Sequence, residues 1–222
     1  MSQALWTAVD SYVEGFLIGP DAALDAALAN SAEAGLPEIA VTPSQGKLLY
    51  LMARMVGARR ILEIGTLGGY STIWLARAVP AEGMVVTLDA DPKHFEVARK
   101  NIVRAGLAKV VDQRLGLALE TLPDLEEEGA GPFDFVFIDA DKENTAEYFG
   151  WAMRLSRPGT AIVVDNVVRE GELSDAATKD PQVLAMRRFH DVLAADTRVS
   201  ATTIQTVGSK GYDGFTLAVV GG

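Results

Sequence analysis

The sequence predicts an α/β fold in which helices cover both faces of one doubly wound sheet of seven strands. Three observations lead to this prediction. Five short apolar runs alternate with amphipathic stretches, which is typical of right-handed βαβ units and a mostly parallel sheet. Two further apolar runs follow with no helix between them, so we expect the last strand to be antiparallel. The chain before the first run has a helical pattern, so we expect N-terminal helices.

The predicted strands are runs of β-branched, aliphatic or aromatic residues bounded by turn residues. We place them at residues 59–65, 84–90, 109–116, 133–140, 160–166, 198–207 and 214–220. The helices between the first five strands are predicted at residues 70–78, 93–105, 118–122 and 146–155. Only "GSKGYDG" separates the last two strands, which predicts an antiparallel hairpin at one edge of the sheet.

Residues 1–57 are predicted to form helices, and one helix start is well marked. At "TPSQ", Thr42 can cap the helix, Pro43 suits the first helical position and Gln45 completes a capping box. The acidic run at residues 126–131 is predicted to be a solvated loop, because charge runs are usually exposed.

Length and composition indicate one domain over residues 1–222, with a helical segment at 1–57 and a sheet core at 58–222. The chain is 49% hydrophobic and 23% charged, which is sufficient for a substantial core. It has no apolar stretch of the ~18 residues that a membrane span needs, and its start lacks the features of a secretory signal. We therefore expect a cytoplasmic protein with no membrane partner.

The residue types exclude several classes of function. The chain has no cysteine and two histidines, which excludes thiolate chemistry, zinc–thiolate sites and multi-histidine metal clusters. Any bound metal must therefore have oxygen ligands. A net charge of −10 and a pI near 4.7 oppose binding to a phosphate backbone. We expect small-molecule partners and no nucleic acid.

Ligands of doubly wound sheets bind beyond the carboxyl ends of the strands. The first strand ends in "EIGTLGGYS", where Glu63 and Gly65 precede a glycine-rich turn and a helix opens near Ser71. The spacing differs from the dinucleotide pattern G-x-G-x-x-G. The second strand ends in Asp89, which could accept hydrogen bonds from both hydroxyls of an adenosine ribose. Alternatively, Asp91 caps the next helix and Asp89 has no role.

Three segments together resemble the S-adenosylmethionine-dependent O-methyltransferases of the caffeoyl-CoA and catechol type. They are "LEIGTLGGYS", "FDFVFIDADKEN" and "VVDN", and the resemblance extends from about residue 41 to residue 222. It implies a Rossmann-like fold, S-adenosylmethionine as cofactor, a divalent metal and a homodimer. It also implies which residues contact the cofactor. Val41, Glu63 and Gly65 would contact the methionine end, and Ser71 would contact the methionine carboxylate. Asp89 would contact the ribose, Gly116 and Ala118 the adenine, and Asp139 would make a further contact.

The fourth and fifth strands also end in polar residues, Asp139 and the pair Asp165 and Asn166. Their oxygen atoms can converge on one rim of the sheet, and Mg prefers such ligands. Two buried strands that end in uncompensated carboxylates are costly unless a cation is present. We therefore expect these three residues to bind Mg or another divalent cation. Alternatively, Asp165 and Asn166 form a turn before an exposed loop at residues 167–175.

Lys142, three residues after Asp139, is the candidate catalytic residue together with that aspartate. Methyl transfer to an oxygen needs an oxyanion, and a bound metal favours ionisation of a phenolic hydroxyl. Lys142 could take the proton or hold the phenolate by charge. Alternatively, it is a solvated residue of a helix that begins at Lys142 and is capped by Asp141.

We therefore expect divalent-metal-dependent methyl transfer from S-adenosylmethionine to a hydroxyl of a catechol-like small molecule. The acceptor itself is open, because plant members that use CoA thioesters commonly have a tryptophan shortly after the "DN" pair, whereas this chain has Arg169 and Glu170 there. One alternative is an NAD-dependent oxidoreductase, which the missing G-x-G-x-x-G opposes. Another is a non-catalytic S-adenosylmethionine-binding protein, which the intact Asp139, Lys142, Asp165 and Asn166 oppose.

Overall fold

The computed structural model describes residues 2–222. Its strands are β1 (Arg60–Ile64), β2 (Met84–Asp89), β3 (Val111–Leu115), β4 (Phe133–Ile138), β5 (Ser156–Asp165), β6 (Val199–Gly208) and β7 (Gly211–Val220). Its helices are α1 (Gln3–Leu17), α2 (Ala22–Glu33), α3 (Pro43–Met55), α4 (Tyr70–Ala78), α5 (Pro92–Arg104), α6 (Ala118–Glu127), α7 (Thr145–Arg154) and α8 (Pro181–Ala195), with a 3-10 helix η1 (Arg169–Ser174).

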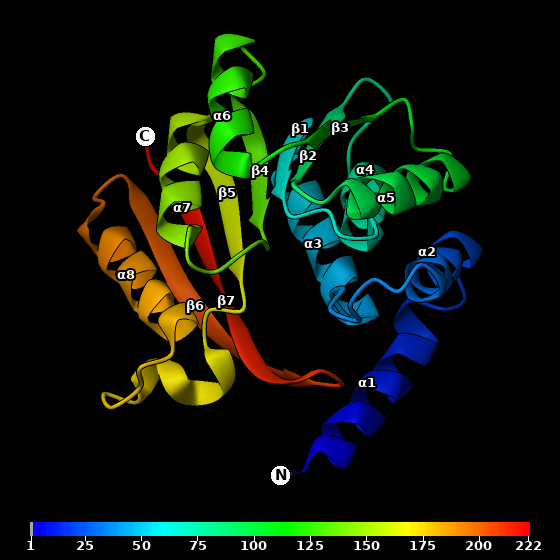
Figure 1. Cartoon of the computed structure of the whole chain (residues 1–222), viewed down its shortest axis with the longest axis horizontal. Coiled ribbons are helices and arrows are strands. Elements are labelled where there is room, and N and C mark those ends of the chain that lie inside the picture. Colours follow the sequence, from blue (N-terminus) through cyan, green and yellow to red (C-terminus); the bar gives the residue numbers. More distant parts are fainter. Residues whose placement is uncertain (1) are drawn as a thin grey trace.

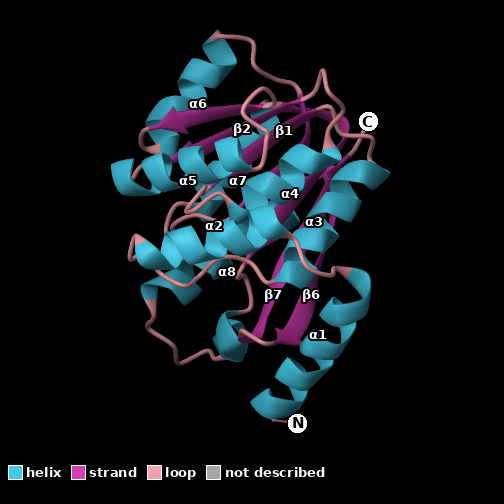
Figure 2. Ribbon diagram, turned by 90° about the vertical axis from the view of Figure 1, so that its right-hand side faces the viewer, coloured by secondary structure: helices cyan, strands magenta, loops and turns pink. Residues whose placement is uncertain are grey.

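The strands form one seven-stranded sheet in the order β3-β2-β1-β4-β5-β7-β6, with helices on both faces (Figure 1, Figure 2). β1 to β5 pair in parallel, whereas β7 is antiparallel to both of its neighbours. The winding reverses between β1 and β4, which is where such sheets bind ligands. The predicted fold class is confirmed.

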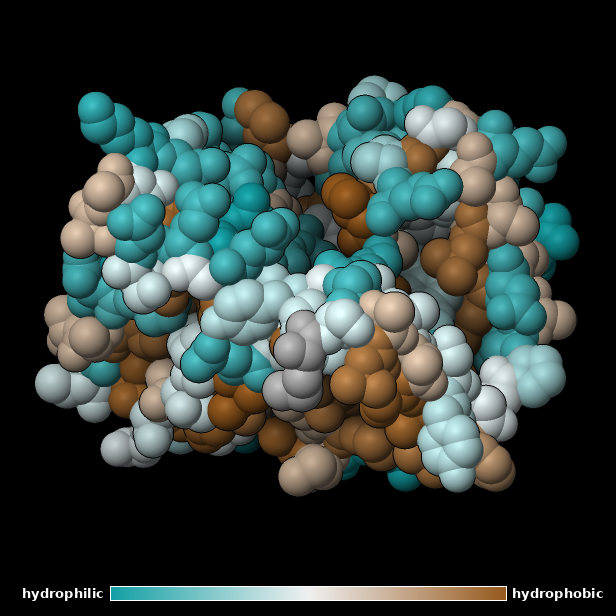
Figure 3. Space-filling model, turned by 90° about the horizontal axis from the view of Figure 1, so that it is seen from below, coloured by the Kyte–Doolittle hydropathy of each residue, from teal (hydrophilic) through white to brown (hydrophobic). Residues whose placement is uncertain are grey.

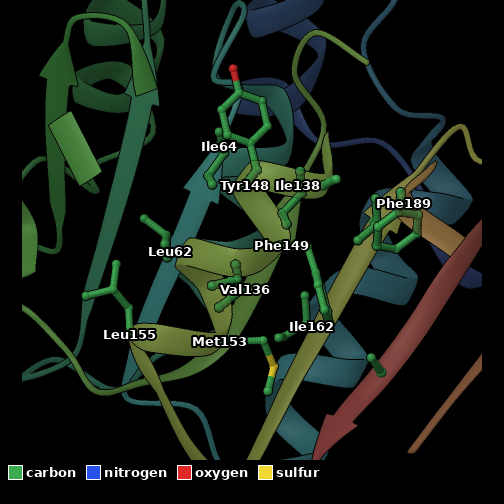
Figure 4. Packing of buried hydrophobic residues seen from close by; sticks show 14 of the residues in the cluster. Leu62, Ile64, Val136, Ile138, Tyr148, Phe149, Met153, Leu155, Ile162 and Phe189 are labelled. Carbon is green, nitrogen blue, oxygen red and sulfur yellow. The ribbon is translucent and has the colours of Figure 1, made fainter. Parts of the chain in front are cut away.

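The sheet separates two apolar cores. One lies under α6, α7 and α8 and the other under α2, α3 and α4. Successive residues of a strand point to opposite faces, so Leu62 and Ile64 of β1 face the first core and Ile61 faces the second. Figure 4 shows the first core, where strand side chains meet α7 and α8; it labels Leu62, Ile64, Val136, Ile138, Tyr148, Phe149, Met153, Leu155, Ile162 and Phe189.

The N-terminal segment is helical, as predicted, and α3 starts at the predicted residue. Thr42 Oγ1 accepts a hydrogen bond from the Gln45 backbone N–H at 3.2 Å, and Pro43 takes the first helical position. The second half of the expected capping box is wrong. The Gln45 side chain does not complete the box at Thr42 but donates a hydrogen bond to Asp165. A tertiary partner has thus replaced the local one.

Helix α1 projects from the core at the N-terminal end of the molecule (Figure 1) and buries none of its residues. Its exposed apolar side chains include Leu5, Val9, Tyr12 and Phe16. Figure 3 shows the molecule from below, where hydrophobic residues form extended brown areas. Within residues 2–222, no helix is both long enough and apolar enough to cross a membrane.

The hairpin at the sheet edge is confirmed, but its predicted loop is wrong. β6 and β7 stay paired up to Gly208 and Gly211, so the turn contains only Ser209 and Lys210. Gly211 has a φ of 99°, which an L side chain rarely adopts and which lets so short a turn close. The segment predicted as a seven-residue loop is therefore mostly strand.

Other predicted boundaries differ where packing outweighs local signals. α6 continues to Glu127 rather than ending at residue 122, so the acidic run begins inside a helix. Leu122 and Leu125 are fully buried there, and their packing offsets the hydrogen bond that Pro123 cannot donate. The predicted loop at residues 167–175 contains η1, and β3 and β5 begin at Val111 and Ser156.

Candidate active site

Glu63 lies at the end of β1 with its side chain directed toward the start of α4. It is fully buried and accepts hydrogen bonds from Ser71 Oγ at 2.6 Å, Thr72 Oγ1 at 2.5 Å and Thr87 Oγ1 at 2.6 Å. Burial raises the pKa of Glu63 to about 7, although the three hydroxyl groups act in the opposite direction. Both carboxylate oxygens therefore bind side chains of α4 or β2, and Glu63 fixes the Ser71 side chain.

Gly65 is the point where the glycine-rich turn meets the end of β4. It has a φ of 103°, and a Cβ at this position would lie 2.0 Å from the carbonyl oxygen of Asp139. The resemblance implied that this glycine contacts the methionine end of the cofactor. In the structure, the closest approach is to the backbone of Asp139, so glycine is required to bring the two predicted halves of the site together.

Asp89 holds the glycine-rich turn in place from the end of β2. Its Oδ2 accepts hydrogen bonds from the backbone N–H groups of Thr66 at 3.2 Å and Leu67 at 2.8 Å. His94 Nδ1 lies 3.2 Å from Asp89 Oδ1. Asp91 does cap α5, as the alternative proposed, but Asp89 is not incidental.

The other predicted cofactor residues lie at the same end of the sheet or beside it. The Gly116 N–H donates to the Asp89 carbonyl at 2.9 Å, which ties the end of β3 to β2. Ala118 is the first residue of α6. Val41 is buried in the second core, immediately before the cap of α3.

The second half of the site contains the three predicted metal ligands. Asp139 Oδ1 accepts a hydrogen bond from Lys142 Nζ at 2.9 Å. Asp165 is only 5% exposed, and its two oxygens accept from the Asn166 backbone N–H at 2.8 Å and from Gln45 Nε2 at 2.6 Å. Asn166 has a φ of 57°, a left-handed conformation that asparagine tolerates.

The electrostatics of this half suit a cation. Burial first, and then the charge of Asp139, raises the pKa of Asp165 to about 7, against the effects of Lys142, Asn166 and Gln45. Two carboxylates and an amide oxygen form the kind of donor set that hard divalent cations prefer. Within residues 2–222, no group of three or more acidic, histidine or cysteine side chains could hold a metal, so a cation here would need the Asn166 oxygen as well.

Lys142 is not a solvated helix residue. Its side chain is 10% exposed, and α7 begins three residues later, at Thr145. The prediction that Asp141 caps a helix beginning at Lys142 is therefore wrong. Asp141 Oδ2 instead accepts from Asn144, through the backbone N–H at 3.3 Å and Nδ2 at 2.6 Å, and Asp141 also bonds Tyr148. This turn before α7 positions Lys142 beside Asp139.

Three residues near the site were missed by the sequence analysis. Gln45 was assigned to a cap, and no local pattern indicates its contact with Asp165. His94 was assigned no role, although its place in the first turn of a helix capped by Asp91 could have suggested the contact with Asp89. Lys210 Nζ bonds the carbonyl groups of residues 38 and 40, and burial lowers its pKa while Asp139 and Asp165 act to raise it.

A cavity of about 470 Å³ lies at the opposite rim of the sheet, beside the amino ends of β1, β2, β4 and β5. Its buried acid, Asp134, is already paired with Arg157 and with the backbone N–H groups of residues 59 and 60. This cavity lacks the carboxylates that lie at the carboxyl ends of the strands. We therefore place the candidate active site at the carboxyl ends of β1, β2, β4 and β5.

Comparison with known proteins gives close matches over nearly the whole chain. A family model described as O-methyltransferase matches residues 22–219. Catechol O-methyltransferases of Niastella koreensis and Mycobacterium tuberculosis are each 54% identical. The first match covers 99% of this chain and 100% of that protein, and the second covers 96% and 94%.

Solved structures agree in fold at comparable identity. An O-methyltransferase from Bacillus cereus in complex with SAH has a TM-score of 0.97 at 57% identity and covers 99% of this chain and 100% of its own. The O-methyltransferase TomG from Streptomyces achromogenes, involved in tomaymycin synthesis and solved in complex with SAM, has a TM-score of 0.96 at 51% identity and covers both chains completely.

Proposed function

Because the chain belongs to the S-adenosylmethionine-dependent O-methyltransferase family, we propose that it methylates one hydroxyl of a vicinal diphenol in a divalent-metal-dependent reaction. The observation that carries this proposal is the group of Asp139, Asp165 and Asn166, with Lys142 beside it. The names of the two relatives at 54% identity support the catechol class of acceptor.

The half of the rim at β1 and β2 would bind S-adenosylmethionine. Ser71, held by Glu63, lies at the opening of α4, where its hydroxyl and free helical N–H groups suit the methionine carboxylate. Asp89 would accept the ribose hydroxyls. Gly116 and Ala118 would lie at the adenine, and Val41 beside the methionine part. The SAH and SAM in the neighbouring structures support this assignment.

Asp139, Asp165 and Asn166 would hold Mg or another divalent cation, and their donor chemistry fits one. When bound, the cation would supply the positive charge that favours ionisation of a nearby acceptor hydroxyl. Lys142, whose ammonium group already pairs with Asp139, would stabilise the reacting oxyanion by charge and keep it in place. Two neighbouring hydroxyl groups on the acceptor match a cation with free coordination positions.

The test compares caffeic acid with para-coumaric acid, which lacks one of the two adjacent hydroxyls. We expect kcat/KM in Mg to be at least about 100-fold higher for caffeic acid, since a site built for a hydroxyl rejects the analogue without it. Excess chelator should abolish turnover and added Mg should restore it. A ratio near one, or full activity in chelator, would contradict the proposal.

We further propose that the protein is a homodimer. The support is the exposed apolar surface of α1, which includes Leu5, Val9, Tyr12 and Phe16 and which no other element of residues 2–222 covers. Larger exposed apolar surfaces commonly mark sites of association.

A further inference from the structure

Gln45 contacts a proposed metal ligand from a distant part of the chain. Its Nε2 donates to Asp165 Oδ2 at 2.6 Å, although 120 positions separate the two residues. Gln45 lies in the first turn of α3, whereas Asp165 ends β5. The contact thus joins the N-terminal helices to the rim of the sheet.

The backbone that carries Gln45 is fixed on several sides. Thr42 caps its N–H at 3.2 Å, and the neighbouring Ser44 Oγ donates to Glu14 Oε1 at 3.1 Å. At the next residue, Gly46, a Cβ would lie 2.3 Å from the Trp74 ring, so α3 and α4 are in close contact there. The side chain of Gln45 therefore starts from a rigid position.

The amide of Gln45 sets the orientation of the Asp165 carboxylate. One oxygen accepts from the Asn166 N–H at 2.8 Å and the other from Gln45. A carboxylate oxygen has two acceptor positions, so each keeps one for a further partner. Lys142 holds Asp139 in a similar way, at 2.9 Å. Each of the two carboxylates thus has one side-chain donor.

We propose that Gln45 is a positioning residue for the divalent cation and acts by fixing the Asp165 carboxylate. The inference rests on the proposed metal site. An amide suits this role because it donates a hydrogen bond without adding a positive charge that would repel the cation. Groups that orient metal ligands in this way typically contribute 10- to 100-fold to metal affinity.

The test compares Gln45→Met with the wild type. Methionine keeps an unbranched side chain but has no N–H donor, and Ser44→Ala is the matched control because it changes the same helical turn without a contact to Asp165. Isothermal titration of Mn²⁺, with S-adenosylhomocysteine present, measures metal affinity directly. We expect Gln45→Met to bind Mn²⁺ about 10- to 100-fold more weakly, and Ser44→Ala to bind it as the wild type does.

Steady-state kinetics provide a second measurement of metal affinity. The Mg concentration for half-maximal rate should rise by the same factor in Gln45→Met, while kcat at saturating Mg and the thermal melting temperature stay close to wild type. A merely structural role would instead lower the melting temperature. If Gln45→Met does not fold, Gln45→Asn, whose amide is one methylene too short to keep the contact, should show the same loss of Mn²⁺ affinity.

The outcomes separate this inference from the proposed function. Equal Mn²⁺ affinity in Gln45→Met and wild type, with Asp165→Asn binding none, would overturn the role of Gln45 and leave the metal site standing. A wild-type protein that binds no Mn²⁺ would overturn the metal site and the inference together.

Discussion

The carboxylates of the two halves of the rim differ in how many protein donors they accept from. At β1 and β2, Glu63 accepts hydrogen bonds from three hydroxyl groups and Asp89 accepts from the backbone of the glycine-rich turn. At β4 and β5, Asp139 and Asp165 have fewer donors. Burial, and then the charge of Asp139, raises the pKa of Asp165.

This difference lies in the number of protein donors, since Asp139 accepts from one side chain and Asp165 from one side chain and one backbone N–H. Glu63 and Asp89 hold neighbouring parts of the chain in place through these contacts, and Asp89 would also accept the ribose hydroxyls. The like charge of Asp139 acts on the buried carboxylate of Asp165, and a cation beside the two would relieve this repulsion. Substitutions in the first half should therefore change cofactor affinity and stability, whereas those in the second half should change the chemical step.

The largest effect should come from Lys142→Met, in the second half. We expect kcat to fall by about 10² to 10⁴-fold, the usual range for a group that acts on the reacting proton or charge. Affinity for S-adenosylhomocysteine, measured by calorimetry, should stay near wild type because Lys142 contacts Asp139 and not the first half. Lys100→Met, at an exposed lysine of α5, is the control. A kcat equal to wild type would remove Lys142 from the reaction.

A smaller effect should follow from Asp89→Ala, in the first half. The variant loses the proposed ribose contact and the acceptor for the Thr66 and Leu67 N–H groups. We expect cofactor binding to weaken by roughly 1 to 3 kcal/mol, the range for hydrogen bonds to charged groups. Calorimetric titration with S-adenosylhomocysteine measures this. Asp91→Ala removes the helix cap and a 3.9 Å contact with His94, and it should lower stability while leaving cofactor affinity unchanged. Unchanged affinity in Asp89→Ala with weakened affinity in Asp91→Ala would refute the assignment.

The sequence was a good guide to the sheet and a partial guide to the site. The strand ends were predictable because hydrophobic runs that stop at Glu63, Asp89, Asp139 and Asp165 leave those residues at one edge of a parallel sheet. The contact of Gln45 with Asp165 was not predictable, because it depends on how α3 packs against the sheet. Local capping rules favoured a different partner for the same side chain.

The hairpin and the end of α6 were misjudged for a related reason. The glycines at 208, 211 and 214 indicate turns in the sequence, yet pairing between β6 and β7 continues through most of that segment. Packing of Leu122 and Leu125 likewise extends α6 past Pro123. Long-range packing decides such boundaries, and one sequence contains no direct signal for it.

The smallest effect at neutral pH should come from Glu63→Gln, which changes stability rather than chemistry. Burial raises the pKa of Glu63 from 4.5 to about 7 in the folded protein. Between these values the folded protein binds more protons at this group than the unfolded chain does, so the free energy of unfolding falls as pH rises. The favourable contribution of the protonated group is fully present below about 4.5 and is lost as pH rises through about 7.

Glutamine cannot ionise, so Glu63→Gln should lack this part of the pH dependence. Urea unfolding at pH 5, 6, 7 and 8 measures the free energy of unfolding of both proteins. Across that range the value for the variant should rise relative to the wild type by on the order of 2 kcal/mol, as expected for a pKa difference of this size. Glu82→Gln, at an exposed glutamate, should give a difference from wild type that does not change with pH. Parallel curves for wild type and Glu63→Gln would mean that Glu63 is ionised throughout in the folded protein. The three hydroxyl groups would then offset its burial completely, and of these two buried acids only Asp165, in the second half, would keep a raised pKa.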